Sequence, residues 1–500
     1  MTSFEQNHPI FSGDAEPVCS DHSHESDNGA ETEPLDDWGL SFEDRLPKIR
    51  ELCRQVWPDA DHDKTRVEEP QEGGWNRVYP ITITENGTTR SYVIRIPAYE
   101  YEVKENVLIL KYLEGRKHQV PIPALITYDV DHHNPLMYPF IIMERVPGED
   151  LDCIYPSLTQ HQKLVVAKKL GIVYQQLQAV TNPVSGFMKL VNEEDEDISS
   201  EPWIMPLGVK ERWPKDDARV ENICDELLTP GTFRIEPPEL SSKDVLLLAF
   251  KRRLFYSRAC DFEWEVKIEE EAIEAINHIA SSSLLDDKVI CLWHTDLFPR
   301  NIMVDVETDP TDPVITGVID WDDAAFAPRF MACRPPDWLW GPNNVNNDIN
   351  TKITDSPAGD YRDGGGRETS GCGERTLDEE PLEPLQPQSA DALEIKQAFD
   401  SSVGNEYCSR AYDPRFIVLR RLLHHSLHAK WSGKILDKFE RTLAHWRNTK
   451  DIVYPPIGPD VEAQCELNDK KERANAPVST EVRIERAPSS LMTCIKEYLS

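Results

Sequence analysis

The hydrophobic pattern of the chain changes from strand-like to helix-like at Pro147-Gly148, and this change limits the fold to two unlike parts. Before this turn, residues 75–84 and 89–96 alternate in polarity or are β-branched, and Asn86-Gly87 between them is typical of a β-hairpin. Further strands are expected at 65–67, 124–129 and 139–144, and helices at 46–56 and 101–116. The sequence therefore predicts a small β-rich lobe with one main helix.

After Pro147-Gly148, apolar residues recur at helical spacing, so we expect a larger lobe that is mostly helical. Helices are expected at 160–180, 243–256, 268–282, 416–427 and 435–446. Between 289 and 323 the pattern returns to short strands and tight loops. The predicted fold class is α+β with two lobes, an arrangement that favours a ligand site in the cleft between them.

Composition separates polar segments from the two lobes. Residues 1–38 are acidic and lack periodic hydrophobic residues, which predicts a disordered tail. Residues 342–392 are rich in Asn, Asp, Gly, Pro and Ser and are expected to be a disordered insertion, and 456–500 a polar C-terminal tail. The N-terminal lobe is then expected at 39–146 and the C-terminal lobe at 147–455.

The charge of the chain argues against nucleic acids and membrane surfaces as partners. Its 54 Lys and Arg against 89 Asp and Glu leave a net charge of −35, which repels phosphate backbones and anionic lipids. No apolar run approaches the length of a membrane span, and the first 44 residues lack the Lys or Arg of a secretory or transit segment. The 11 cysteines form no CxxC pair, so we expect a reducing, cytoplasmic compartment and leave the oligomeric state open.

One segment places polar groups at fixed offsets between two short apolar strands, expected at 301–304 and 315–319. Asp296 precedes Asn301 by five residues, and Asp320 ends the next strand. Phosphoryl transfer needs a group that orients or deprotonates the attacking hydroxyl, and oxygen ligands that hold Mg²⁺ against nucleotide phosphates. Two carboxylates and an amide at this spacing supply these parts. The alternative interpretation is a surface loop whose Asp and Asn side chains form turns.

The residues around these groups resemble the catalytic loop of the aminoglycoside phosphotransferase family, a branch of the protein-kinase-like fold. The family pattern is His, any residue, Asp, four residues and Asn, followed by an Ile-Asp-Trp segment. It is matched by WHTDLFPRNIMVD at 293–305 and GVIDWDD at 317–323. The resemblance implies an ATP-dependent phosphotransferase with a small β-rich lobe, a larger helical lobe and a hydroxyl-bearing acceptor that the sequence does not identify.

The resemblance also implies a role for each matched residue. Asp296 would be the catalytic base, and His294 would brace the loop. Asn301 and Asp320 would hold Mg²⁺ against the phosphates of ATP. Arg300 lies four residues after the base, and its positive charge, together with Mg²⁺, would keep the Asp296 carboxylate ionised.

Three stretches before Pro147 resemble the nucleotide site of this family. Gly73, Gly74 and Asn76 belong to a segment similar to the loop whose backbone N–H groups approach the phosphates, although a plain turn fits it equally well. Arg95 stands on a strand where a kinase keeps its phosphate-binding lysine, and its guanidinium can bind the α- and β-phosphates. The adenine would hydrogen-bond to the backbone of the hinge between the lobes, near Glu144 and Val146.

The match departs from the family at the helix acid that pairs with the strand cation. Asn106 stands where a glutamate is expected. Glu105 is adjacent to it and Glu102 lies one turn earlier on the same face, and of the two Glu102 is the expected partner of Arg95. This departure favours an alternative, a kinase-like pseudoenzyme that binds nucleotide or a partner without turnover. A protein kinase is a further alternative. It is disfavoured because no Ala-Pro-Glu segment, typical of a protein-kinase activation loop, follows Asp320.

Overall fold

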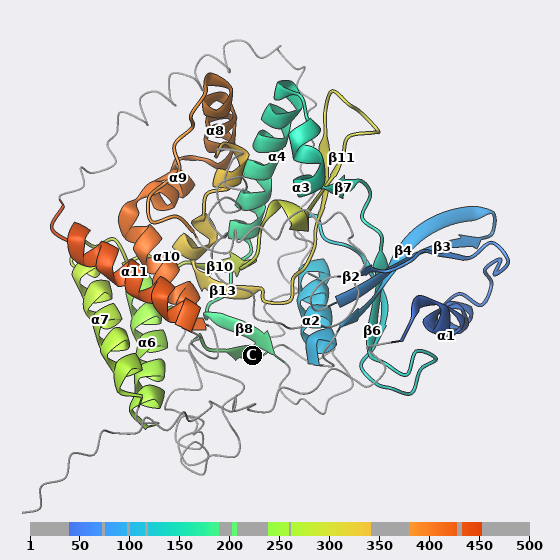
Figure 1. Ribbon diagram of the computed structural model, residues 1–500, viewed down its shortest axis with the longest axis horizontal. Coiled ribbons are helices and arrows are strands. Elements are labelled where there is room, and N and C mark those ends of the chain that lie inside the picture. The colour runs from blue at the N-terminus through green and yellow to red at the C-terminus, as the bar shows by residue number, and fades with distance from the viewer. Residues whose placement is uncertain are drawn as a thin grey trace, which may run out of the picture.

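The chain forms a β-rich lobe and a larger helical lobe. A computed structural model describes residues 40–72, 76–97, 101–115, 119–189, 203–207, 239–259, 262–341, 380–427 and 433–452. In Figure 1 the blue part of the chain forms the sheet at one end of the molecule, and the green-to-red part forms the helical mass at the other. The expected tails at 1–38 and 456–500 lie outside the described residues.

The β-rich lobe is built on one six-stranded antiparallel sheet with the order β1-β3-β4-β6-β5, in which β2 also pairs with β3. Its strands are β1 (Arg66–Val67), β2 (Gln71–Glu72), β3 (Asn76–Glu85), β4 (Thr88–Pro97), β5 (Leu125–Asp129) and β6 (Phe140–Glu144). Asn86 and Gly87 join β3 to β4 with φ of +51° and +77°, as a two-residue hairpin of this type requires. The predicted strands and hairpin are therefore confirmed.

The two helices of this lobe, α1 (Phe42–Val56) and α2 (Tyr101–Gly115), belong to different cores. Leu52 of α1 is buried with the sheet in a small core. The helix begins at Phe42 rather than at 46 because the Ser41 hydroxyl accepts an N–H of the first turn at 3.2 Å. Val107 of α2 instead belongs to the large core of the helical lobe, so α2 connects the two lobes.

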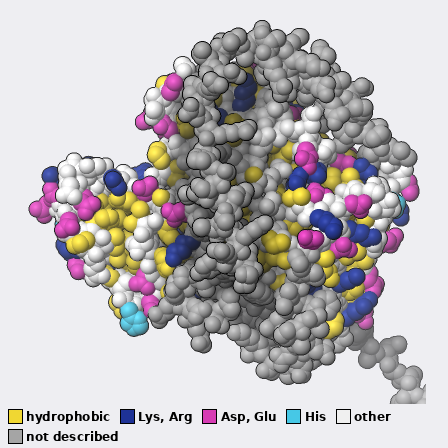
Figure 2. Space-filling view, turned by 180° about the vertical axis from the view of Figure 1, so that it is seen from behind, with side chains coloured by type: hydrophobic (Ala, Val, Ile, Leu, Met, Phe, Trp, Pro, Cys, Tyr) yellow, Lys and Arg dark blue, Asp and Glu magenta, His cyan; other side chains and the backbone are white. Residues whose placement is uncertain are grey.

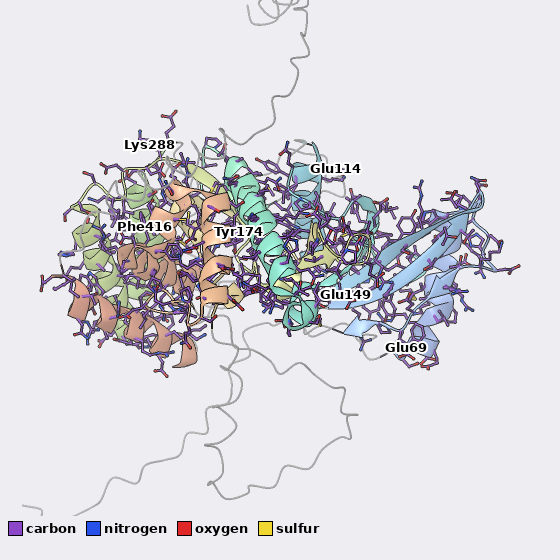
Figure 3. The ribbon with its side chains drawn as sticks, turned by 90° about the horizontal axis from the view of Figure 1, so that it is seen from above. Glu69, Glu114, Glu149, Tyr174, Lys288 and Phe416 are labelled. Atoms are coloured by element: carbon purple, nitrogen blue, oxygen red, sulfur yellow. The ribbon has the colours of Figure 1, made fainter. Side chains whose placement is uncertain are left out.

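The helical lobe combines long helices with two small antiparallel sheets in the orders β10-β13-β8-β9 and β12-β11-β7. Its helices are α3 (Leu151–Ile154), α4 (Gln160–Ala179), α6 (Ser242–Ala259), α7 (Glu263–Ala280), α8 (Ala390–Val403), α9 (Asn405–Tyr412), α10 (Pro414–Leu427) and α11 (Gly433–Thr449). Its strands are β7 (Glu149–Asp150), β8 (Gly186–Lys189), β9 (Trp203–Met205), β10 (Ile290–Trp293), β11 (Ile302–Asp305), β12 (Val314–Val318) and β13 (Ala325–Pro328). Seen from above, α4 with Tyr174 lies between the sheet lobe and the helices around Phe416 (Figure 3).

The core of the helical lobe includes part of the segment expected to be an insertion at 342–392. Residues 342–379 lie outside the described residues, but the chain is packed from Glu380 onward, which corrects the predicted boundary. Glu380 is buried and accepts hydrogen bonds from Arg420 Nε at 2.9 Å and from Arg420 Nη2 at 2.6 Å. The polar composition alone predicts a loop here. It does not reveal that an arginine 40 residues away stabilises the buried carboxylate. Ser389 then caps α8, a helix that the apolar spacing does not predict.

The described surface carries charges of both signs. Figure 2 shows Asp and Glu side chains next to Lys and Arg side chains on both sides of the face in view. The acidic excess therefore does not form a continuous acidic face among the residues coloured there. Among the helices that the structure describes, none has the length and apolar composition needed to cross a membrane.

Candidate active site

The loop between β10 and β11 is tied to the end of β12 through Ile319. The Ile319 N–H donates to the Asn301 carbonyl at 3.0 Å, and the Ile319 carbonyl accepts a hydrogen bond from His294 Nε2 at 3.0 Å. The His294 ring is buried 4.5 Å from that of Trp321, and burial lowers its pKa. A neutral histidine that donates from Nε2 therefore holds the loop against the segment that contains Asp320.

Asp296 is held by two residues of its own loop and reaches the surface. Asn301 Nδ2 donates to Asp296 Oδ2 at 2.8 Å and to its backbone carbonyl at 2.9 Å. Arg300 Nη2 lies 2.8 and 2.9 Å from the two carboxylate oxygens. A short 3₁₀ turn, Pro299–Asn301, presents both donors. Because the Asp296 side chain is 34% exposed, an oriented carboxylate is accessible to a hydroxyl from outside.

Asp320 lies two residues after the end of β12 and has a left-handed backbone, at a φ of +66°. Such a conformation costs a non-glycine residue about 1–2 kcal/mol, so the surrounding contacts must hold it. Burial, and then the neighbouring Asp322, raise the pKa of Asp320, whereas Arg95 lowers it. A cation at this carboxylate would favour its charged form.

The donor set at this point fits Mg²⁺. Asn301 uses Nδ2 for Asp296, so Oδ1 is the atom that would bind a cation together with the Asp320 carboxylate. Within the described residues, no group of three or more His, Cys, Asp or Glu side chains is arranged to hold a metal. Mg²⁺ commonly takes one or two protein oxygens and completes its shell with waters and substrate phosphates, so two ligands suffice.

Arg95 extends from β4 to the segment after β12. Its Nε donates to Asn76 Oδ1 at 2.8 Å, and its Nη1 donates to Asn106 Oδ1 at 3.0 Å. Asp322 accepts a forked pair, from Nη1 at 2.8 Å and from Nη2. Nη2 also lies 3.4 Å from Asp320 Oδ1. The expected phosphate-binding side chain therefore lies beside the expected metal ligand.

The carboxylate that pairs with this arginine was missed by sequence reasoning. The side chain of Glu102, the expected partner, lies outside the described part of the structure, and Glu105 pairs with Lys189. Among the described side chains of α2, Asn106 contacts the guanidinium, and a charged partner is Asp322, 227 residues after the arginine. Two features of the sequence could have pointed to Asp322. It is a second aspartate two residues after Asp320, and the helix has Asn106 at the position where the family has a glutamate.

The hinge between the lobes is the other expected nucleotide contact. Gly73 and Gly74 of the expected phosphate loop lie outside the described residues. The Glu144 N–H donates to the Ala124 carbonyl at 2.9 Å, so this donor is used within the lobe. Val146 lies against Gly317 of β12, where an added Cβ would come within 2.6 Å of Val146 Cγ1. The glycine therefore lets the hinge approach the strand that precedes Asp320.

A small cavity of about 40 Å³ lies beside the loop and is lined in part by Tyr174, Trp293, His294, Phe298 and Arg334. The Phe298 ring centre lies 4.9 Å from the Arg300 guanidinium and 4.8 Å from that of Arg334. Sequence reasoning assigned no role to this aromatic ring. Its position between Asp296 and Asn301 was the available signal.

A protein-family comparison identifies the class to which this fold and loop belong. Residues 66–331, more than half of the chain, match the model of APH, the phosphotransferase enzyme family. The protein belongs to this family, as the catalytic-loop pattern predicted. Membership and the two-lobed architecture confirm the α+β, protein-kinase-like fold and place the chain among kinase-like phosphotransferases.

The chain spans about half the length of the curated relatives it matches. A subtelomeric hrmA-associated cluster protein of Aspergillus fumigatus is 26% identical over 308 residues, which cover 53% of this chain and 58% of the relative. Altered inheritance of mitochondria protein 9, mitochondrial, of Meyerozyma guilliermondii is 22% identical over 330 residues, covering 57% and 52%. Solved structures that resemble the chain include aminoglycoside phosphotransferase APH(4)-Ia, at 14% identity and a TM-score of 0.41, covering 82% of this chain and 100% of that chain. ADP-bound APH(2'')-Ib follows at 12% identity and a TM-score of 0.37, covering 81% and 98%.

Proposed function

We propose that the protein transfers the γ-phosphate of ATP to a hydroxyl group of a small molecule with the help of Mg²⁺. The observation that carries this proposal is the junction at Ile319, which brings a solvent-accessible carboxylate, Asp296, next to an amide and a second carboxylate, Asn301 and Asp320. Phosphoryl transfer depends chiefly on such positioning and on charge stabilisation.

Each residue of the site has a distinct part in this reaction. Asp296 orients the acceptor hydroxyl and accepts its proton, and Asn301 Nδ2 keeps the carboxylate in place. Asn301 Oδ1 and Asp320 would hold Mg²⁺, which when bound neutralises charge on the phosphates. Arg95 supplies a buried positive charge for the phosphates, and Val146 lies at the hinge where adenine would bind.

Metal dependence of nucleotide binding tests this proposal. We expect ATP to bind in calorimetry only weakly without Mg²⁺ and more tightly with it, and Asp320→Ala to abolish the gain because a metal ligand is lost. Asp312→Ala is the control, since this aspartate is 60% exposed in an ion pair with Lys169. Equal affinity with and without Mg²⁺ in the unmodified protein would contradict the proposal.

A pseudoenzyme that binds nucleotide without turnover is the second candidate. Asn106 favours it, because a neutral amide contacts the strand cation where the family has a carboxylate. A screen of small hydroxyl compounds and protein acceptors with ATP and Mg²⁺ separates the candidates. Phosphorylation of a small molecule supports the enzyme, and phosphorylation of protein only supports a protein kinase. Metal-dependent nucleotide binding without any phosphorylated acceptor supports the pseudoenzyme.

The acidic chain also leads us to propose a cytoplasmic protein without nucleic-acid or membrane partners. The charge of −35 repels both kinds of anionic surface. Imaging of a fluorescent fusion and sedimentation with anionic vesicles would test this proposal. A fusion that accumulates on an organelle membrane would contradict it.

A further inference from the structure

Every N–H group of Arg95 has an acceptor within the described residues. A guanidinium carries five such groups, and here they face Asn76, Asn106, Asp322 twice and Asp320. The contact with Asp320, at 3.4 Å, is the longest of the five. It is therefore the contact that can be exchanged at the lowest cost.

Two carboxylates compete for this one guanidinium. The Arg95 side chain is 9% exposed, and those of Asp322 and Asp320 are 24% and 43% exposed. A buried guanidinium that loses its carboxylate pays a large desolvation cost, so it turns to another carboxylate within reach. Without Asp322, the carboxylate that the described residues place within reach is Asp320, whose oxygens are the ones that Mg²⁺ requires under the proposed function.

We propose that Asp322 is a positioning residue that takes the forked hydrogen bonds of Arg95 and so limits the contact of Arg95 with the metal ligand Asp320 to one long hydrogen bond. The inference rests on the proposed function, because it assigns Mg²⁺ to Asp320. When a cation takes that carboxylate, the Nη2–H that faces it becomes available to a phosphate, while Asp322, Asn76 and Asn106 keep the guanidinium in place. The fork on Asp322 thus gives the guanidinium a carboxylate of its own and leaves the metal ligand available.

The Mg²⁺ requirement of ADP binding tests the proposal without any need for an acceptor. We expect Asp322→Asn to raise the Mg²⁺ concentration for half-maximal ADP binding in calorimetry by about tenfold, the effect of one charge-assisted hydrogen bond from Arg95 that Mg²⁺ must displace at Asp320. Asp323→Asn is the matched control, because it removes the adjacent carboxylate, which has no hydrogen bond to Arg95 among the described residues. We expect a clearly smaller change in this control.

A second-site change separates positioning from a loss of fold. Asn106 Oδ1 lies 3.0 Å from Arg95 Nη1, so Asn106→Glu supplies a carboxylate to the guanidinium from α2. We expect Asn106→Glu, added to Asp322→Asn, to return the Mg²⁺ requirement to that of the unmodified protein. The melting temperatures of all variants are measured alongside.

Each outcome of this experiment has one meaning. Three results would overturn the positioning role and leave the proposed function standing. They are an unchanged Mg²⁺ requirement in Asp322→Asn, an equal rise in Asp323→Asn, and a rise in Asp322→Asn that Asn106→Glu does not reverse. A protein without Mg²⁺-dependent ADP binding before any substitution overturns the proposed function and this inference with it.

Discussion

At Asp296 an amide and a guanidinium bind the same carboxylate, and each has a different effect on it. Asn301 fixes the direction of the carboxylate with a hydrogen bond of 2.8 Å. Arg300 places a positive charge at 2.8 and 2.9 Å, while its own side chain stays 44% exposed and its guanidinium lies over the Phe298 ring. Exposure lets an arginine move at low cost, so a substrate hydroxyl can replace it at the carboxylate.

Replacement of the base is the sharpest prediction at the scale of one residue. Asp296→Asn keeps the size of the side chain but removes most of its basicity. We expect turnover of an identified acceptor to fall by about 10²-fold or more, the usual scale for a positioned general base. ADP affinity and melting temperature should stay close to those of the unmodified protein. Unchanged turnover would show that the proton goes elsewhere.

At the scale of secondary-structure elements, the turn between the hinge and β7 depends on close backbone contact with β11. Gly148 has a φ of +93°, and an added Cβ would lie 2.2 Å from the Val304 carbonyl oxygen. β7 pairs with β11 at Val304, so this contact sets the hinge against the strand after the catalytic loop. Gly87 has a comparable φ of +77° in the β3–β4 hairpin, but nothing lies within 4 Å of its Cβ position.

These two glycines make a matched pair for a stability measurement. We expect Gly87→Ala to lower the free energy of unfolding by about 1–2 kcal/mol, the cost of a left-handed alanine. Gly148→Ala should cost clearly more, because the methyl group also collides with a backbone that cannot move alone. Urea titration followed by circular dichroism measures both. Equal losses would mean that the hinge turn can shift away from β11.

At the scale of the whole molecule, long-range contacts join the chain before residue 342 to the chain after 379. Arg420 Nη1 donates to the Phe330 carbonyl at 3.4 Å, and Tyr174 of α4 has its ring 5.5 Å from those of Phe399 and Tyr407. The part of the chain after residue 379 therefore completes the core around α4, which lies between the sheet lobe and the helices around Phe416 in Figure 3.

Limited proteolysis tests this arrangement. The polar composition of 342–379 predicts early cleavage there, whereas the packing of Glu380 predicts protection from that residue onward. We expect the two fragments to co-elute in gel filtration, because the core around α4 contains side chains from both. Fragments that separate without denaturant, or a cut that falls first in 380–392, would contradict the corrected boundary.

Patterns within a few residues determined much of this protein. Apolar spacing located most helices and strands, Asn86-Gly87 located the hairpin, and the five-residue offset between Asp296 and Asn301 identified the loop and the family. These features are readable because helix periodicity, turn conformation and a short polar loop depend on neighbouring residues alone.

The tertiary structure decided which distant charges meet. Arg95 pairs with Asp322, 227 residues away, and Glu380 is buried because Arg420 lies opposite it. A buried charge needs a partner, but residue type and local spacing do not say which of the 89 acidic side chains will be within reach. That choice depends on how the lobes and helices pack, since only packing removes water from one pair of charges and leaves the others in solvent.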